Sequence, residues 1–291
     1  MTKRHLLKAG LAGAAMLAGA GAMAQEVLPV DLPTERNMFG AGAFAMPDFP
    51  GAEDYHAEGG AFLHANLGNG TWLRVIGPEV RLNLVPRYIG ENYSQFNTFR
   101  GGLLWRGRPS RDTDVDDEVV RRMSRVPMAS ELGVFASYSL PMPGNNPLHQ
   151  ILFSGDASWA TNTVYTGAVG NIRATYFYPF PQGLGGKPLL GSLGASLFFT
   201  SDHFTDRYFG INGPDLALFP ELGGIPYRAE GGLTSVRIPF SLTSQIDPKW
   251  SLTVAGRYER LLSDAADSPL VHTRGNENQW VIGASINYYF E

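Results

Sequence analysis

Charged side chains recur at alternate positions in several stretches of the chain, and they are its best candidates for chemistry. Side chains at alternate positions of a β-strand point to the same side, so we expect these residues to face a common interior. Opposite charges there could pair and fill the lumen of a barrel, or they could line a narrow pore. We favour a mostly filled lumen. The predicted lumen-lining residues are Arg81, Arg173, Arg237, Arg257, Glu131 and Glu259.

One serine has neighbours that suggest nucleophilic catalysis. Ser268 follows Asp267 and precedes His272 by four residues. Serine, histidine and a carboxylate are the parts of a hydrolase triad, but a triad is defined by geometry rather than by sequence proximity. The chain lacks the G-x-S-x-G turn that presents a nucleophile in many hydrolases. We therefore expect a turn at Asp267–Pro269 and predict no catalytic residue.

Metal and cofactor sites find no support in the sequence. The five histidines after residue 24 contain no i, i+4 pair, and there is no cysteine; zinc sites are built from such ligands. The run 112–117 resembles the start of a calcium loop, but Asp117 stands where that loop needs glycine and Met123 where it needs glutamate. We interpret the run as a solvated acidic loop and predict neither metal nor cofactor.

The elements that would position these side chains are strands. In 250–259, for example, Trp250, Leu252 and Val254 alternate with polar or small residues, a pattern typical of a strand with one apolar face. Asn69-Gly70 between two such runs predicts a type I′ hairpin. The only candidate helix, 115–125, lies in a charged loop. We predict about twelve strands, with ten as the alternative: 38–46, 60–68, 71–76, 79–88, 97–106, 131–140, 151–160, 171–178, 192–200, 233–242, 250–259 and 279–290.

The lengths of the connections alternate through most of the chain. Those at 107–128, 201–229 and 263–278 are long, whereas 142–147 and 247–249 are short. Bacterial outer-membrane barrels combine long external loops with short periplasmic turns, and they carry aromatic residues near both membrane interfaces. Many of the predicted strands end in Trp, Tyr or Phe. The pattern therefore predicts a closed antiparallel transmembrane β-barrel; the tiny connection Gly77-Pro78 departs from it.

The beginning of the chain predicts export. Lys3, Arg4 and Lys8 precede an apolar stretch that ends in Ala22-Met23-Ala24, which is the pattern of a secretory signal peptide cleaved after residue 24. Residues 25–291 then form a single domain with 20 Lys+Arg against 27 Asp+Glu, a net charge of −7. That balance argues against nucleic acid as a partner. We expect the protein in the outer membrane, in contact with its lipids.

Several short motifs, in order, resemble the MipA/OmpV family of outer-membrane proteins. In chain order they are 40–51, 107–117, 131–133, 206–211, 257–261, Asp264 with 267–271, and 283–290. The resemblance implies a non-enzymatic scaffold that joins a murein hydrolase, a lytic transglycosylase, to a murein synthase, a penicillin-binding protein. A narrow channel or small-solute porin is the alternative function.

The family-motif loop contains Asp264, Asp267, Ser268 and Pro269. The connection lengths place this loop outside the cell, whereas murein enzymes lie in the periplasm. The loop is therefore structural, or the topology is inverted, or scaffolding is not the role of this protein.

Overall fold

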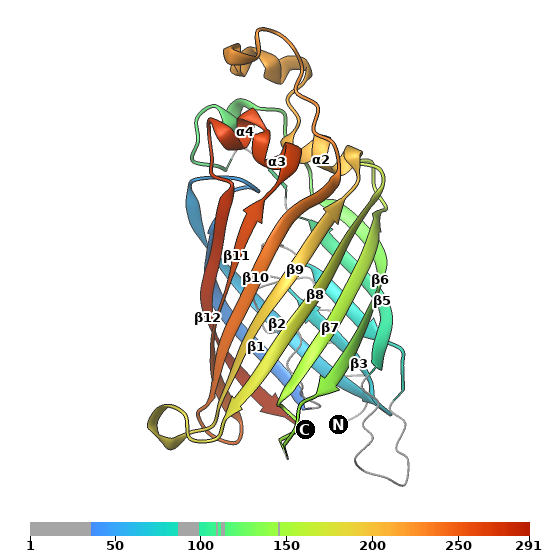
Figure 1. The fold of residues 1–291 in the computed structure, drawn as a ribbon, viewed down its shortest axis with the longest axis vertical. Coiled ribbons are helices and arrows are strands. Elements are labelled where there is room, and N and C mark those ends of the chain that lie inside the picture. The colour runs from blue at the N-terminus through green and yellow to red at the C-terminus, as the bar shows by residue number, and fades with distance from the viewer. Residues whose placement is uncertain (1–35, 87–98, 109, 112–113, 145) are drawn as a thin grey trace.

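Twelve antiparallel strands form one closed barrel (Figure 1). The computed structural model describes residues 36–86, 99–108, 110–111, 114–144 and 146–291. Each strand pairs with its neighbours in sequence, and β1 pairs with β12 to close the sheet. The strands are β1 (Asn37–Pro47), β2 (Tyr55–Gly68), β3 (Thr71–Ile76), β4 (Glu79–Asn83), β5 (Phe99–Arg108), β6 (Ala129–Pro141), β7 (Gln150–Ala160), β8 (Ala168–Phe180), β9 (Leu189–Thr200), β10 (Gly232–Gln245), β11 (Trp250–Leu261) and β12 (Asn278–Phe290). The predicted signal peptide lies outside the described residues. The described part of the chain has no helix long and apolar enough to cross a membrane.

The outward side chains of the strands are apolar and the inward ones are largely polar. In β12, Trp280, Ile282 and Ile286 are each about half exposed, at 49%, 50% and 49%, whereas Gln279 and Asn287 are buried. An exposed apolar band around a polar interior suits a barrel surrounded by lipid. The alternation read from the sequence therefore predicted both the strands and the direction in which their side chains point.

Part of the interior is filled by aromatic rings that pack over glycines. A Cβ atom at Gly283 would lie 2.3 Å from the ring of Phe44, and one at Gly40 would lie 2.1 Å from the ring of Phe62. Both rings belong to a buried apolar cluster that also includes Met46. Glycine is needed at these two positions because a Cβ atom there would overlap the ring. Each ring therefore packs directly on the backbone of the neighbouring strand.

The two ends of the barrel differ in their connections. At the end where β1 begins and β12 finishes, the connections are 69–70, 84–98, 142–149, 181–188 and 246–249. At the opposite end they include 109–128, 201–231 and 262–277. We call these the short-turn end and the long-loop end. The two-residue turn at the short-turn end has Asn69 and Gly70 both at positive φ, 52° and 78°, as a type I′ hairpin requires.

The long loops contain helices that the sequence analysis did not predict. They are α2 (Asp202–Phe209), α3 (Ser263–Asp267) and α4 (Pro269–His272), with 3₁₀ turns η2 (Val120–Arg122), η4 (Gly213–Leu218) and η5 (Pro220–Leu222); η3 (Leu184–Gly186) lies at the short-turn end. Figure 1 shows α2, α3 and α4 together over the long-loop end. Helices of four to eight residues are too short to show a clear 3.6-residue period.

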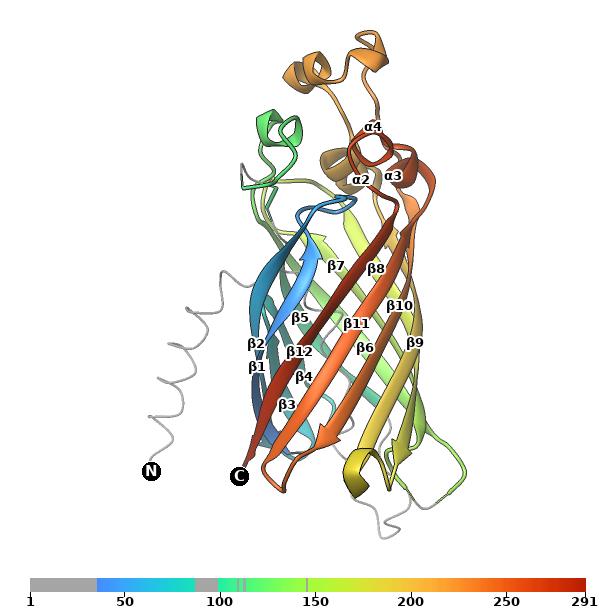
Figure 2. The same ribbon diagram turned by 90° about the vertical axis from the view of Figure 1, so that its left-hand side faces the viewer.

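The wall of the barrel is incomplete beside β2. β2 pairs with β1 from Tyr55 onward, but it pairs with β3 only from Phe62, because β3 and β4 are just six and five residues long. The last backbone contact is from Gly77 N to Ala61 O, at 3.1 Å. In Figure 2, β2 begins near the long-loop end, above the labels of β3 and β4. We call the stretch 55–60, which pairs with β1 but with no described strand on its other side, the wall gap. Gly77-Pro78 is the two-residue turn of this short hairpin, and the predicted strand 79–88 was too long because β4 ends at Asn83.

Candidate functional site

A buried network of ion pairs joins the inward faces of β4, β5, β6 and β7. Its centre is Arg106, whose Nε lies 2.8 Å from Glu79 Oε2 and whose Nη2 lies 2.9 Å from Asp156 Oδ1. A third carboxylate, Glu131, lies 3.9 Å from Arg106 Nη1. No side chain in this group is more than 6% exposed. One guanidinium therefore connects carboxylates from three other strands.

Arg81 completes this network. Its Nε lies 2.6 Å from Glu79 Oε1, and its Nη2 lies 3.4 Å from Asp156 Oδ2. Glu79 and Asp156 are thus each shared between two arginines. The planar guanidinium suits this role, because its donors form a rigid fork that can reach two acceptors.

Glu131 is fully buried and satisfied on several sides. It pairs with Arg108, and it accepts hydrogen bonds from the hydroxyl of Tyr165 and from Ser158 Oγ, the latter at 2.6 Å. Tyr165 comes from the loop after β7. Burial raises the pKa of Tyr165, and the neighbouring Glu131 carboxylate acts in the same direction. The hydroxyl therefore stays protonated and remains a donor.

A second network lies on β10 and β11. Glu259 accepts from Arg237 Nε at 2.7 Å and from Ser235 Oγ at 2.6 Å, and it pairs with Arg257 at 2.9 Å. The guanidinium of Arg237 also lies 3.9 Å from the centroid of the Phe198 ring. Cation–π contact of this kind is favourable where the cation is shielded from water. This network fixes the inner faces of two neighbouring strands.

Five of the six side chains predicted from sequence belong to one of these two networks. Arg81 and Glu131 belong to the first network, and Arg237, Arg257 and Glu259 to the second. Arg173 is buried on β8, where its register partners are Ser154 and Ser196. The sequence analysis missed Glu79, Arg106 and Arg108. Arg108 was placed in a loop because β5 was expected to end at residue 106, whereas the alternation of Arg106 and Arg108 continues the strand.

Two apolar clusters cover the long-loop end. One contains Val126, Ala129, Tyr165, Val169, Phe198, Phe204, Tyr208, Phe209, Ala229, Leu261, Ala265 and Val271. The other contains Phe49, Ala52, Val115, Val119, Val120, Met123, Ile211, Phe219 and Leu270. Their members come from several loops and from the strand ends. We call this assembly the cap. It gives the long loops a core of their own.

The family-motif loop belongs to the cap. Ser268 is fully buried; its hydroxyl donates to Phe209 O at 2.5 Å, and its oxygen accepts from Leu270 N at 3.3 Å at the start of α4. Asp264 Oδ2 accepts from Glu230 N at 2.8 Å. These contacts tie α3 and α4 to α2 and to the 201–231 loop. They give Ser268 a structural role at the junction of α3 and α4.

The other members of the motif lie at the surface of the cap. Asp267 is exposed, and Pro269 is the first residue of α4. The hydroxyl of Tyr227 donates to Asp264 O at 2.8 Å. Burial raises the pKa of Tyr227 to about 12, with the charges of Asp264 and Asp267 adding to the effect. Tyr227 therefore donates this hydrogen bond at any physiological pH.

The acidic run of the 109–128 loop also has structural contacts. Asp117 Oδ1 accepts from the backbone N of Val119 and of Val120, both at 2.8 Å, and so caps η2. Asp116 N donates to Asp48 Oδ2 at 2.9 Å, which joins this loop to the β1–β2 connection. Asp112, the first residue of the calcium-loop resemblance, lies outside the described residues.

Comparisons with known proteins agree with this architecture. A model of the family described as MltA-interacting protein MipA matches residues 39–290. Outer membrane protein OmpV of Vibrio cholerae is 31% identical over 96 residues, and Omp26La of Vibrio anguillarum is 30% identical over 96 residues. Each alignment covers 33% of this chain and 34% of the relative. The chain thus spans about a third of the length of these relatives.

Solved outer-membrane proteins also match this structure, with TM-scores below 0.5 and low sequence identity. An outer membrane channel from Pseudomonas putida F1 has a TM-score of 0.47 at 11% identity, covering 91% of this chain and all of that one. A bacterial polysaccharide outer membrane secretin has a TM-score of 0.39 at 8% identity, covering 88% of this chain and 99% of that one. The family match extends over nearly the whole barrel. The chain belongs to the MipA (MltA-interacting protein) family, and it is an outer-membrane β-barrel protein.

Proposed function

We propose that this protein is a non-enzymatic scaffold of the outer membrane rather than a diffusion channel. The observation that carries the proposal is the filled interior, where Arg106 lies among three carboxylates with side chains at most 6% exposed. The cap adds a second layer over the long-loop end. A barrel of about this size can be filled by its own side chains, as smaller barrels are.

The proposed partners follow from the family. Its name describes interaction with MltA, and we propose that this chain binds a murein hydrolase and, with it, a murein synthase. Such enzymes would meet the barrel from the periplasm. The contact surface would then be the short-turn end, whose turns include 142–149, 181–188 and 246–249. The family-motif loop would not contact these enzymes, and its role would be limited to the structure of the cap.

Binding to a purified murein-cleaving lytic transglycosylase tests this assignment. Replacing the 142–149 turn by a two-residue Asn-Gly connection should weaken binding of the enzyme to the reconstituted barrel. The matched control removes residues 213–224 from the long-loop end and should leave binding unchanged. Binding that depends on the control segment and not on the turn would contradict the proposal.

A narrow channel remains the second candidate, because charged side chains such as Arg173 and Arg237 face inward. Planar-bilayer recording separates the two functions. We expect no steady stepwise conductance from the purified protein. Conductance steps that change when Arg237→Glu or Arg257→Glu is introduced would favour the channel and overturn the scaffold proposal.

A further inference from the structure

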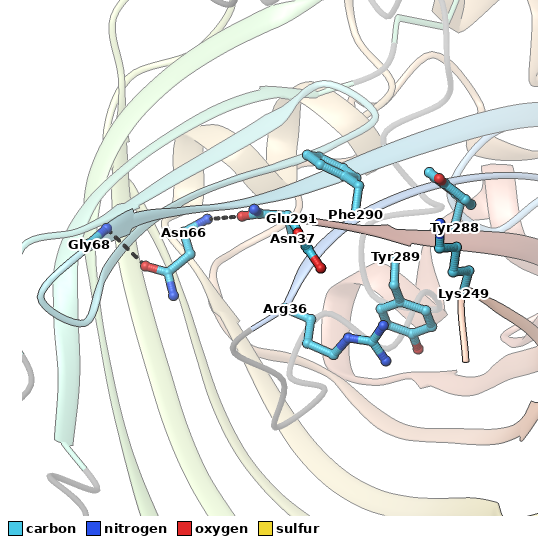
Figure 3. A pocket seen from close by; sticks show the side chains of 9 residues that line it. All are labelled: Arg36, Asn37, Asn66, Gly68, Lys249, Tyr288, Tyr289, Phe290 and Glu291. Atoms are coloured by element: carbon cyan, nitrogen blue, oxygen red, sulfur yellow. Dashed lines mark hydrogen bonds between the residues drawn. The ribbon is translucent and has the colours of Figure 1, made fainter. Parts of the chain in front are cut away.

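A cavity of about 730 Å³ opens at the short-turn end, beside the seam between β1 and β12. Figure 3 shows the side chains that line it. The chemically distinctive members are two cations, one carboxylate and three aromatic rings: Arg36, Lys249, Glu291, Tyr288, Tyr289 and Phe290. Neither the charged networks of the interior nor the cap accounts for this group.

The two cations are anchored to the same turn. Arg36 Nη2 donates to Pro248 O at 2.7 Å, and its guanidinium lies 4.5 Å from the centroid of the Tyr289 ring. Lys249 is the next residue along that turn, and its carbonyl accepts from Tyr289 N at 2.8 Å. Arg36 is therefore held by contacts of its own side chain, and Lys249 by its backbone. Both line the same cavity.

The cavity spans the end of the barrel wall. Tyr289 points inward, since it is 6% exposed and its hydroxyl lies 3.1 Å from the buried Ser251 Oγ. Tyr288 points outward and packs on Trp250, with 4.8 Å between ring centroids. Figure 3 shows Tyr288 and Phe290 on the opposite side of β12 from Tyr289 and Arg36. The cavity thus borders both the lumen and the lipid.

The position of the cavity matches the headgroup level of the inner leaflet. Trp250, Tyr288 and Phe290 lie at the end of the membrane-spanning strands, where aromatic residues mark the interface. Cations at this level attract the phosphates of lipids. A soluble periplasmic anion would not contact the outward rings, whereas the acyl chains of a lipid would pack on them.

We propose that this cavity binds the phosphoethanolamine headgroup of an inner-leaflet phospholipid. The phosphate lies between Arg36 and Lys249, and the ammonium group faces Glu291. The acyl chains run along Tyr288 and Phe290. Glu291 distinguishes this headgroup from phosphatidylglycerol, which has a phosphate but no ammonium group to offset the carboxylate. This inference depends on the outer-membrane location and not on the proposed scaffold function.

Native mass spectrometry of the detergent-purified protein tests the proposal by lipid titration. The unaltered protein should retain phosphatidylethanolamine in preference to phosphatidylglycerol. Lys249→Met should weaken phosphatidylethanolamine binding about fivefold, the contribution of one basic residue near a lipid surface. Glu291→Gln should reduce the preference between the two lipids. The matched control is Lys187→Met at the same end, where the ammonium lies 3.0 Å from Ile246 O; it should leave binding unchanged.

Three results would overturn the proposal. The first is equal retention of both lipids by the unaltered protein. The second is a loss with Lys187→Met as large as the loss with Lys249→Met. The third is displacement of the lipid by soluble glycerophosphoethanolamine at equal concentration, because a site that recognises a lipid must also use its acyl chains. Heat-modifiable migration on gels verifies that each variant is folded, so that a loss of binding is not a loss of the barrel.

Discussion

At the scale of single residues, two arginines organise the first network of the interior, because Arg81 and Arg106 each bind more than one carboxylate. Removing a charge from water is costly, and only close pairing with good geometry compensates for it. Arg106 meets that condition with contacts of 2.8 and 2.9 Å to Glu79 and Asp156. The sign of each charge is visible in the sequence. The partner of each charge is not.

This pairing predicts a large effect of a single substitution. Arg106→Ala leaves three buried carboxylates short of a cation, and it should lower the free energy of unfolding by about 3–5 kcal/mol. Urea titration of the protein in lipid vesicles measures the loss. Arg260→Ala is the control, because its ion pair with Glu277 is about 40% exposed on both sides, and exposed pairs contribute at most about 1 kcal/mol. Equal losses in the two variants would show that the Arg106 network does not stabilise the barrel.

At the scale of elements, the wall gap is the main irregularity of the sheet. Backbone groups of an antiparallel strand point alternately to its two sides. Since Ala61 O accepts from Gly77 N, the backbone groups of Ala57 and Gly59 face the gap. Lipid-exposed sheet edges do not occur in the hydrocarbon region unless protein buries them or water reaches them. No described residue covers the outer face at Gly59, because a Cβ atom there would meet no described atom within 4 Å. Since described protein does not bury this edge, we expect water to reach it.

Cysteine labelling distinguishes a wet edge from a lipid-covered one. The native chain has no cysteine, so one introduced thiol reports on its own position. Gly59→Cys should react rapidly with a charged, membrane-impermeant maleimide in intact outer membranes. Ile172→Cys should react slowly, because that side chain points to lipid from β8, which is paired on both sides. Equal rates at the two positions would contradict a water-filled gap.

At the scale of the whole molecule, the two ends of the barrel have different architectures. The long loops build a cap with its own apolar core, whereas the opposite end consists of turns and the cavity beside β12. Outer-membrane barrels place long loops outside the cell. We therefore expect the cap to be the surface that the cell exposes.

Trypsin treatment of intact cells tests this orientation. Arg228 is exposed in the 201–231 loop, and Lys249 is exposed at the short-turn end. We expect cleavage after Arg228 in intact cells, and cleavage after Lys249 only after the outer membrane is permeabilised. Peptide mass mapping identifies the sites. Cleavage after Lys249 in intact cells, with Arg228 protected, would show that the barrel is inserted the other way round.

The sequence alone was sufficient for the fold class, for the number of strands and for the hairpin at Asn69-Gly70. Each of these is a local property, because a two-residue period and a turn dipeptide need no information from distant residues. The family resemblance was likewise visible in short motifs, and the family model confirms it.

Tertiary structure decided what the local pattern could not. The neighbours of Arg106 come from strands whose register is set by the whole sheet, and the cap forms only when loops distant in sequence meet. The short β3–β4 hairpin opens the wall gap because its neighbours continue without it. Alternation predicts the face on which a side chain lies, since that depends on one strand. Closure of the barrel determines which residues that side chain contacts, because the contacts depend on the positions of all twelve strands.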